Sequence, residues 1–297
     1  MPAPLTIVGL GELLWDVFPD GSRRLGGAPA NAAYHASALG DHGVLLTRVG
    51  ADAAGGAALT LLKDRGVDVS QVQRDRSRPT GTARIQLAPE PSFSFDMAAA
   101  WTDPEWTDAW QELVAGCDAL CFGTLLCAQP AGRRVLERAA AAASARALRL
   151  LDVNLRPPYT PDAAVDAALA LCSAVKLSEE EAAALGARLR VPDVAGHLLG
   201  RGLRAVALTR GARGSLLLTP EGRHACPGFP LPGPEPGHDA VGAGDAFTAA
   251  LAHHLVRGHP VERTNVAANR YAAHVASRAG AMPEIPEALR QEMKGEP

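Results

Sequence analysis

The sequence predicts an α/β protein with a doubly wound, mostly parallel sheet and a small β lid. Short apolar runs of buried-strand type alternate with alanine-rich helical stretches for most of the 297 residues. Such alternation is typical of a parallel sheet covered by helices on both faces. Two neighbouring segments instead alternate apolar and polar residues, which predicts a hairpin with one solvated face.

The amino-terminal part of the chain reads as two strand–helix pairs. Each predicted helix ends at a glycine, Gly40 or Gly66, and glycine is favoured after helix ends because it adopts positive φ without strain. The expected elements are, in order, Thr6–Leu10, Asn31–Leu39, Val44–Val49 and Ala53–Arg65.

The same alternation continues through the middle of the chain. The runs expected to form buried strands are Ala119–Phe122, Leu148–Val153, Ala174–Leu177 and Ala205–Thr209. Helices are expected at Pro130–Ala145, Pro161–Cys172 and Glu179–Leu185, and an apolar helix at Ala246–Val256 follows a proline- and glycine-rich loop over 228–237. Successive β-α-β units bring the carboxyl ends of these strands to one edge of the sheet, where ligands bind in open α/β folds.

The small β lid is expected from the segments that break this pattern. Gly81–Leu87 and Ser92–Asp96 are separated by Pro89-Glu90-Pro91, and Leu14–Phe18 joins them. We therefore expect one domain over residues 1–297, with the lid built from about 12–28 and 80–102. Exposed strand edges invite pairing with another chain, so a homodimer through the lid is an open alternative.

Composition excludes several classes of function. The net charge is −3, from 29 basic and 32 acidic residues, and no basic stripe points to nucleic acid. No apolar run reaches membrane-spanning length, and Met1 to Pro4 do not resemble the start of a signal peptide. We expect a cytoplasmic protein. The five cysteines lack C-x-x-C spacing and are expected to be buried free thiols, and the nine histidines are expected to bind no metal.

The run Asp239-Ala-Val-Gly242-Ala-Gly244-Asp245 precedes the apolar helix and carries the strongest functional signal. Two glycines around Ala243 allow a turn whose backbone N–H groups point at one spot, and the helix dipole adds positive potential there. Asp245 lies beside this anion cradle, where it can take a proton from an alcohol. The pattern predicts phosphoryl transfer to a hydroxyl group, and the helix N-terminus predicts that Asp245 is ionised at neutral pH.

Polar residues after the first strand are candidates for binding a ligand. Gly26 and Gly27 would let a ligand approach the backbone, and Asn31 offers both a donor and an acceptor. An ordinary loop leading into a helix explains this motif equally well. Asp16 follows the first strand, where ligands bind in open α/β sheets, although a solvated turn residue would look the same.

Two later strands also end in polar residues. Asp152, Asn154 and Arg156 alternate after an apolar strand, which suits hydrogen bonding to a polar ligand, and a capped strand end is the alternative. Ser178 and Glu181 have the spacing of a capping box. Glu181 would also lie near a hydrated Mg²⁺ that bridges nucleotide phosphates, and the two interpretations are compatible.

Other nucleotide-binding patterns are missing. Gly9-x-Gly11 follows the first strand, but Leu14 stands where a dinucleotide fingerprint needs its third glycine. No G-x-x-x-x-G-K-[ST] run occurs, and neither H-R-D nor D-F-G is present, which disfavours P-loop and protein-kinase chemistry.

Taken in this order, the motifs resemble the ribokinase-like family of carbohydrate kinases, also called the phosphofructokinase-B family. The match rests on Gly26-Gly27 with Asn31, and on Asp239–Phe247, which looks like the family's D-T-x-G-A-G-D-x-F. It covers nearly the whole chain. Bacterial fructokinases are the most similar members, through the opening over 11–35, D-x-N-L-R at 152–156 and K-x-S-x-E-E at 176–181.

The resemblance implies a role for each matching residue. Asp245 would be the catalytic base, with Gly242, Ala243 and Gly244 as the anion hole. Sugar contacts would come from Asp16, Gly26, Gly27 and Asn31, and Arg156 would hold substrate or phosphate. The nucleotide would lie at Lys176, Thr209, Gly211, Gly214 and Asn269. Glu181 would serve Mg²⁺, and Asp239 lies where many members bind a monovalent cation such as K⁺.

The implied reaction is ATP-dependent phosphorylation of a sugar, with D-fructose to fructose 6-phosphate as the first choice. The alternatives are another sugar, a sugar acid or a nucleoside as acceptor, or a non-catalytic sugar-binding sensor. The sequence departs from the family pattern at Ala240, where threonine is usual, and at Ser178, where ribokinases carry asparagine. Gly123-Thr124 stands where ribokinases carry an acidic sugar contact, which counts against ribose. Arg210 and Arg213 receive no role.

Overall fold

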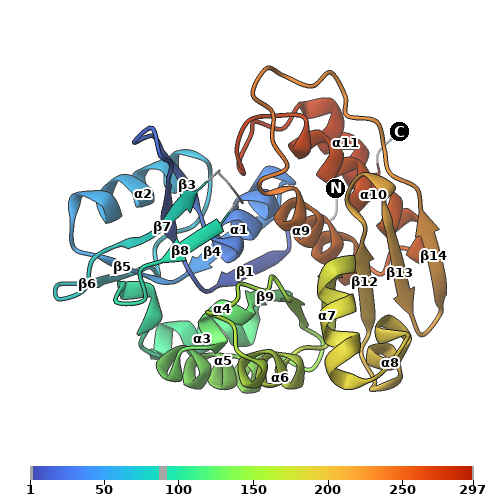
Figure 1. The fold of residues 1–297 in the computed structure, drawn as a ribbon, viewed down its shortest axis with the longest axis horizontal. Helices are drawn as coiled ribbons and strands as arrows, with labels where there is room; N and C mark the ends of the chain where they lie inside the picture. The colour runs from blue at the N-terminus through green and yellow to red at the C-terminus, as the bar shows by residue number, and fades with distance from the viewer. Residues whose placement is uncertain (1–2, 87–91, 296–297) are drawn as a thin grey trace.

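An eight-stranded sheet forms the centre of the molecule (Figure 1). The structure is a computed structural model that describes residues 3–86 and 92–295. The strand order is β14-β13-β12-β11-β10-β9-β1-β4, with parallel pairing from β12 to β4 and antiparallel pairing of β13 and β14 at one edge. The strands are β1 (Thr6–Leu10), β4 (His42–Leu46), β9 (Ala119–Gly123), β10 (Leu148–Asp152), β11 (Ala174–Ser178), β12 (Ala205–Thr209), β13 (Ser215–Thr219) and β14 (Gly222–Cys226).

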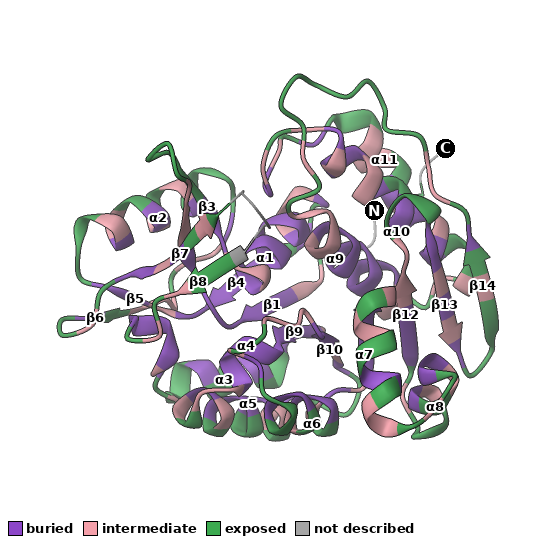
Figure 2. Ribbon diagram, viewed as in Figure 1, coloured by how far each residue is buried: buried purple, intermediate pink, exposed green. Residues whose placement is uncertain are grey.

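Helices cover both faces of this sheet, as expected for a doubly wound fold. In β1, Ile7 faces one apolar cluster and Val8 the other, because successive side chains of a strand point to opposite faces. One face packs against α3 (Asp108–Gly116), α4 (Thr124–Cys127), α5 (Pro130–Ala142), α6 (Asp162–Leu171), α7 (Glu179–Leu189) and α8 (Val194–Gly200). The other packs against α1 (Ala28–Ala38), α9 (Ala243–Val256), α10 (Val261–Ala276) and α11 (Glu287–Lys294). Figure 2 shows the central strands buried between them.

A four-stranded sheet, called the small sheet below, lies apart from the main one (Figure 1). Its order is β3-β2-β7-β8, from β2 (Leu14–Val17), β3 (Arg23–Gly26), β7 (Gly81–Gln86) and β8 (Ser92–Phe95). Leu87 and the Pro89-Glu90-Pro91 turn expected between β7 and β8 lie outside the described residues. A short pair, β5 (Arg48–Gly50) and β6 (Gln73–Asp75), and α2 (Ala53–Asp64) lie beside it.

Several element boundaries differ from the expected ones. Helix α5 ends at Ala142 and not Ala145, α7 extends to Leu189 and not Leu185, and α9 begins at Ala243 and not Ala246. Two further differences have a clear physical reason. The first helix begins at Ala28 and not Asn31, because Pro29 fits the first turn of a helix, where its missing N–H is not needed. The strand expected over Val44–Val49 divides at Thr47, since β4 pairs with β1 whereas β5 pairs with β6. The sequence pattern also does not mark β3, β13, β14, α3, α8, α10 or α11.

The five cysteines are buried and free, as expected. Among the described residues, no helix is long and apolar enough to cross a bilayer.

Candidate active site

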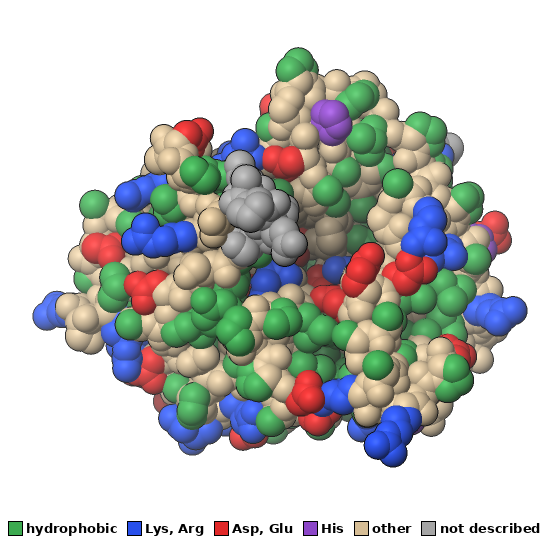
Figure 3. Space-filling view, in the orientation of Figure 1, with side chains coloured by type: hydrophobic (Ala, Val, Ile, Leu, Met, Phe, Trp, Pro, Cys, Tyr) green, Lys and Arg blue, Asp and Glu red, His purple; other side chains and the backbone are tan. Residues whose placement is uncertain are grey.

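A cavity of about 850 Å³ opens between the main sheet and the small sheet. In the space-filling view it is a hollow that contains both acidic and basic side chains (Figure 3). The cavity brings together ten of the residues predicted from the sequence: Asp16, Gly26, Gly27, Asn31, Arg156, Lys176, Asp239, Gly242, Gly244 and Asp245. Five others do not line it, namely Glu181, Thr209, Gly211, Gly214 and Asn269, and neither does Ala243.

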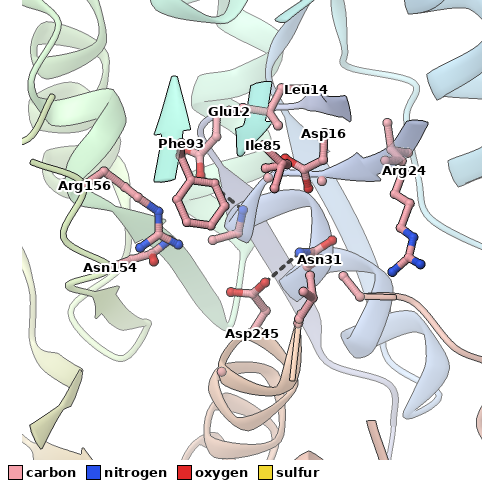
Figure 4. Close-up of a pocket in the computed structure, with 18 of the residues that line it drawn as sticks. Glu12, Leu14, Asp16, Arg24, Asn31, Ile85, Phe93, Asn154, Arg156 and Asp245 are labelled. Atoms are coloured by element: carbon pink, nitrogen blue, oxygen red, sulfur yellow. Dashed lines mark hydrogen bonds between the residues drawn. The ribbon is translucent and has the colours of Figure 1, made fainter. Parts of the chain in front are cut away.

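Asp245 lies in the first turn of α9 and is held by Asn31 from the first turn of α1 (Figure 4). Asn31 Nδ2 donates a hydrogen bond to Asp245 Oδ2 at 2.6 Å. Asn31 Oδ1 is buried and has no partner among the described residues. The contact fixes the Asp245 carboxylate at the cavity wall and leaves the amide oxygen of Asn31 as a free acceptor beside it.

The pKa of Asp245 differs from the sequence-based expectation. Burial, followed by the charge of Asp152, raises it to about 7, against the opposing effects of the Asn31 hydrogen bond, Lys176 and Arg156. The expectation of full ionisation at neutral pH was therefore wrong, because desolvation outweighs the helix dipole here. A carboxylate that titrates near neutral pH is suited to accept and release a proton.

The N-terminus of α9 is open toward the cavity. Its N-cap is Gly242, in the left-handed conformation with φ 78°, and no side chain caps the helix. The amide of Ala243 donates to Ala240 O at 3.2 Å and closes the turn. The prediction had this N–H donating to a ligand, but in the structure it is bonded within the turn. The amides of Gly244 and Asp245 are first-turn amides without intrahelical acceptors. Both of these N–H groups are donors that face an anion at the helix terminus.

A buried cation lies next to this helix terminus. Lys176 Nζ contacts both carboxylate oxygens of Asp152 at 3.0 Å, and Thr248 Oγ1 donates to Asp152 Oδ2 at 3.0 Å. A Cβ built on Gly244 would lie 3.0 Å from Lys176 Nζ, so glycine leaves the space that the ammonium needs. Burial disfavours the charge, but Asp152 and Glu181 more than compensate and raise the pKa of Lys176. The lysine therefore stays protonated beside the anion cradle.

Asp16 points from β2 into the cavity. Its carboxylate lies against Gly26, where a Cβ would come within 2.6 Å of Asp16 Oδ2. Burial raises the pKa of Asp16 to about 6, while Arg156 and Arg24 act in the opposite direction. The glycine is thus required for the orientation of this carboxylate, which gives the double-glycine motif a packing role as well.

Arg156 reaches the cavity from the loop after β10. Its guanidinium lies 5.4 Å from the ring centre of Phe93 in β8, a cation–π contact between the core and the small sheet (Figure 4). Asn154 before it adopts positive φ, 42°, and Glu181 Oε1 accepts from Leu155 N at 2.7 Å. The segment that carries Arg156 is therefore fixed by the first turn of α7.

Glu181 forms the predicted capping box with Ser178. Its Oε2 accepts from Ser178 N at 2.7 Å, so both carboxylate oxygens already receive a backbone N–H. Each oxygen keeps lone pairs that suit a water-bridged contact to Mg²⁺, as such ions retain several waters in phosphate sites. No cluster of three or more metal-binding side chains occurs among residues 3–86 and 92–295.

Apart from Lys176 in β11, the residues assigned to the nucleotide lie around the ends of β12 and β13. Thr209 is the last residue of β12. A single 3₁₀ turn begins at Gly211 and is followed by Gly214, and both glycines have positive φ. Asn269 is 8% exposed, and its Nδ2 donates to Ser215 Oγ at 2.6 Å in a buried network with Asn265. Arg213 pairs with Glu179, and Arg210 donates to Ser215 O, so both arginines have local structural contacts.

The Asp239 carboxylate, which the family resemblance assigned to a monovalent cation, already has partners on both of its oxygens. Arg24 from β3 pairs with Asp239 Oδ2 at 2.6 Å. The other oxygen accepts from Val241 N at 3.1 Å and Gly280 N at 3.3 Å. The guanidinium thus places a positive charge of the chain itself where the family resemblance implied K⁺.

Sequence reasoning missed several cavity residues, among them Glu12, Arg24, Ile85 and Phe93. Glu12 follows the first strand directly and carries the signal of a strand-end polar residue. The others lie on the small sheet, and their positions depend on long-range pairing that no local pattern reveals.

An open helix N-terminus beside a carboxylate, at the carboxyl edge of a doubly wound sheet, suits a phosphotransferase that acts on an alcohol group. The chain belongs to the pfkB family of carbohydrate kinases, which it matches over residues 17–288. It is an ATP-dependent sugar kinase.

Individual relatives agree with this family. The chain is 30% identical to the fructokinase of Klebsiella pneumoniae, over 82% of this chain and 81% of that protein. It is 28% identical to the aminoimidazole riboside kinase of Salmonella typhimurium, over 88% of this chain and 84% of that protein. The crystal structure of the sugar kinase PH1459 of Pyrococcus horikoshii in complex with ATP matches with a TM-score of 0.80 at 26% identity, over 93% of this chain and 94% of that one.

Proposed function

We propose that this kinase transfers the γ-phosphoryl group of ATP to O6 of D-fructose. The observation that carries the proposal is Asp245, held by Asn31 at the open N-terminus of α9 in the cavity that Asp16 also lines. Asp245 accepts the proton of the sugar hydroxyl while the hydroxyl oxygen of the sugar bonds to the γ-phosphorus. The bond from that phosphorus to the β,γ-bridging oxygen breaks, and ADP leaves.

Charge at the phosphate end supports this assignment. The transition state of phosphoryl transfer is loose, so positioning and charge stabilisation supply most of the catalysis. The amides of Gly244 and Asp245 and the ammonium of Lys176 face the transferring group. Mg²⁺ bound near Glu181 would neutralise charge on the nucleotide phosphates. We propose that the small sheet acts as the lid that excludes water, with residues 12–28 and 80–102 contributing to it.

Charge at the sugar end favours a neutral acceptor. Glu12, Asp16 and Asp245 all line the cavity, and three acidic groups disfavour an anionic substrate near them. The fructokinase of Klebsiella pneumoniae among the relatives supports fructose. A sugar acid is the second candidate, because Arg156 forms no ion pair with a carboxylate within the described part of the chain.

A substrate screen tests the proposal. We expect ATP- and Mg²⁺-dependent ADP release to be fastest with D-fructose, compared with D-ribose, a 2-keto-3-deoxy sugar acid and a nucleoside. Turnover of the sugar acid without turnover of fructose would overturn the choice of acceptor in favour of the second candidate.

Asp16→Ala is expected to raise the sugar KM by about tenfold or more, because it removes a half-buried hydrogen-bond acceptor for a hydroxyl. The KM for ATP should stay unchanged. Asp64→Ala, at an exposed position on α2, is the matched control. An equal loss for both ligands in Asp16→Ala would contradict a sugar-binding role.

The rate is expected to be the same in KCl and in tetramethylammonium chloride, since Arg24 already occupies the Asp239 carboxylate. Arg24→Gln frees that carboxylate, so K⁺ should raise both the rate and the melting temperature of this variant. Activation of the wild type by K⁺, with no difference in Arg24→Gln, would show that the guanidinium does not replace the ion.

A further inference from the structure

Glu12 is a buried carboxylate whose two oxygens have different surroundings. It follows β1, it lines the cavity, and only 4% of the residue is exposed. Oε1 accepts a hydrogen bond from the Ala28 amide at 3.1 Å. Oε2 is shielded from bulk water and has no partner among the described residues. Figure 4 shows the side chain above Asp245, among the groups that surround the cavity.

The first oxygen acts as a remote cap for α1. The N-cap of this helix is Gly27, which has no side chain to satisfy the first amides. Gly27 also packs on the backbone of Glu12, where a Cβ would come within 2.3 Å of Glu12 O. The turn that begins at Ala28 carries Asn31, which holds Asp245. The first turn of α1 therefore connects Glu12, which contacts Ala28, to Asp245, which contacts Asn31.

The second oxygen lacks the partner that a buried polar atom normally has. Unpaired buried acceptors are uncommon in folded proteins, because losing water without a replacement donor destabilises the folded state. Asn31 Oδ1, from the adjoining turn, is also buried without a partner. Two such acceptors at one cavity wall are satisfied by a ligand that brings O–H donors. A polyhydroxylated, uncharged sugar has these donors, whereas a carboxylate does not.

We propose that Glu12 is a specificity-determining residue, with Oε1 positioning the start of α1 and Oε2 accepting a hydrogen bond from a hydroxyl of the acceptor sugar. This inference rests on the proposed function, but it concerns whichever hydroxylated acceptor gives turnover. Burial raises the pKa of Glu12 to about 7, against the two backbone hydrogen bonds that favour its charged form. The raised value agrees with a carboxyl group that has one unsatisfied oxygen.

The test compares Glu12→Gln with Glu12→Ala on the acceptor that the wild type phosphorylates. Gln keeps one carbonyl oxygen for the Ala28 amide and replaces the other oxygen by an NH₂ group, whereas Ala removes both contacts. We expect Glu12→Gln to raise the sugar KM by roughly tenfold or more, with the KM for ATP and the melting temperature unchanged. Glu12→Ala should in addition lower kcat and the melting temperature. Glu137→Gln, on the exposed side of α5, is the control.

Deoxy analogues of the sugar identify the bonded hydroxyl. The wild type should bind the analogue that lacks this hydroxyl more weakly than it binds the full sugar. Glu12→Gln should bind that analogue and the full sugar equally well, because the variant has already lost the hydrogen bond. A sugar KM of Glu12→Gln equal to that of the wild type, or equal increases of both KM values, would overturn the inference. Turnover of another hydroxylated acceptor without turnover of fructose overturns the proposed fructose assignment alone. An absence of turnover with every acceptor overturns both.

Discussion

Asp245→Asn is expected to fold and to bind sugar, but to lose phosphoryl transfer by ~10²–10⁴ in kcat, the usual cost of removing a general base. The asparagine keeps a carbonyl oxygen that accepts the Asn31 hydrogen bond, so the positions of α1 and α9 are preserved. Steady-state kinetics and sugar-binding calorimetry on the same preparation separate the chemical step from binding. Near-wild-type kcat would remove Asp245 from the mechanism.

The dependence of kcat/KM on pH is a second test of the role of Asp245. The carboxylate must be ionised to accept a proton, and its pKa in the free protein is about 7. The kcat/KM of the wild type should therefore fall as pH decreases below about 7, and it should fall more steeply than that of Asp245→Asn, in which only Glu12 and Asp16 still titrate in the sugar site. Asp64→Asn, at the exposed end of α2, is expected to reproduce the wild-type profile.

Gly244→Ala keeps its backbone N–H, but the added methyl group crowds the anion hole, so we expect kcat to fall by up to the ~10²–10³ that follows the loss of one aligned donor. The added methyl group would lie 3.0 Å from Lys176 Nζ, and that ammonium is fixed by Asp152 and cannot move freely. The methyl group therefore intrudes between the ammonium and the phosphate. Initial rates at saturating ATP and sugar measure the effect.

A second glycine-to-alanine change controls for the backbone effect of the substitution. Gly56 lies within α2, and a Cβ built on it meets nothing within 4 Å. Gly56→Ala should leave kcat unchanged and stabilise the protein by up to about 1 kcal/mol, because alanine is the better helix former. Unchanged kcat in Gly244→Ala would mean that the transferring group is bound elsewhere.

The parallel core could be predicted because each buried strand is a continuous apolar run between helical stretches. Ala119–Phe122 and Ala205–Thr209 coincide with β9 and β12 to within one residue. The antiparallel edge, β13 and β14, is different. Gly222–Cys226 is mostly polar and exposed, so its sequence does not resemble a core strand. Ser215–Thr219 has three consecutive leucines, but no helical stretch separates it from β12, with which it pairs antiparallel.

The site residues also divide into those that a local sequence pattern predicts and those that depend on the assembled fold. Residues next to glycines or strand ends, such as Asp16 and Asp245, could be placed from local pattern. The Glu12–Ala28 and Arg24–Asp239 contacts depend on how distant segments meet, and no spacing rule encodes them. The pKa of Asp245 was missed for a related reason: its dominant cause is the burial created by the assembled fold, which a local sequence does not reveal.

The Asn31–Asp245 hydrogen bond joins residues 214 positions apart in the chain. In the proposed mechanism, the sugar contact Asn31 is synthesised long before α9, the helix that carries the proton acceptor. A nascent chain that stops short of α9 therefore lacks the proposed base, whatever else it has folded. Under this proposal, competence for turnover arises only once α9 has been synthesised and packed against α1.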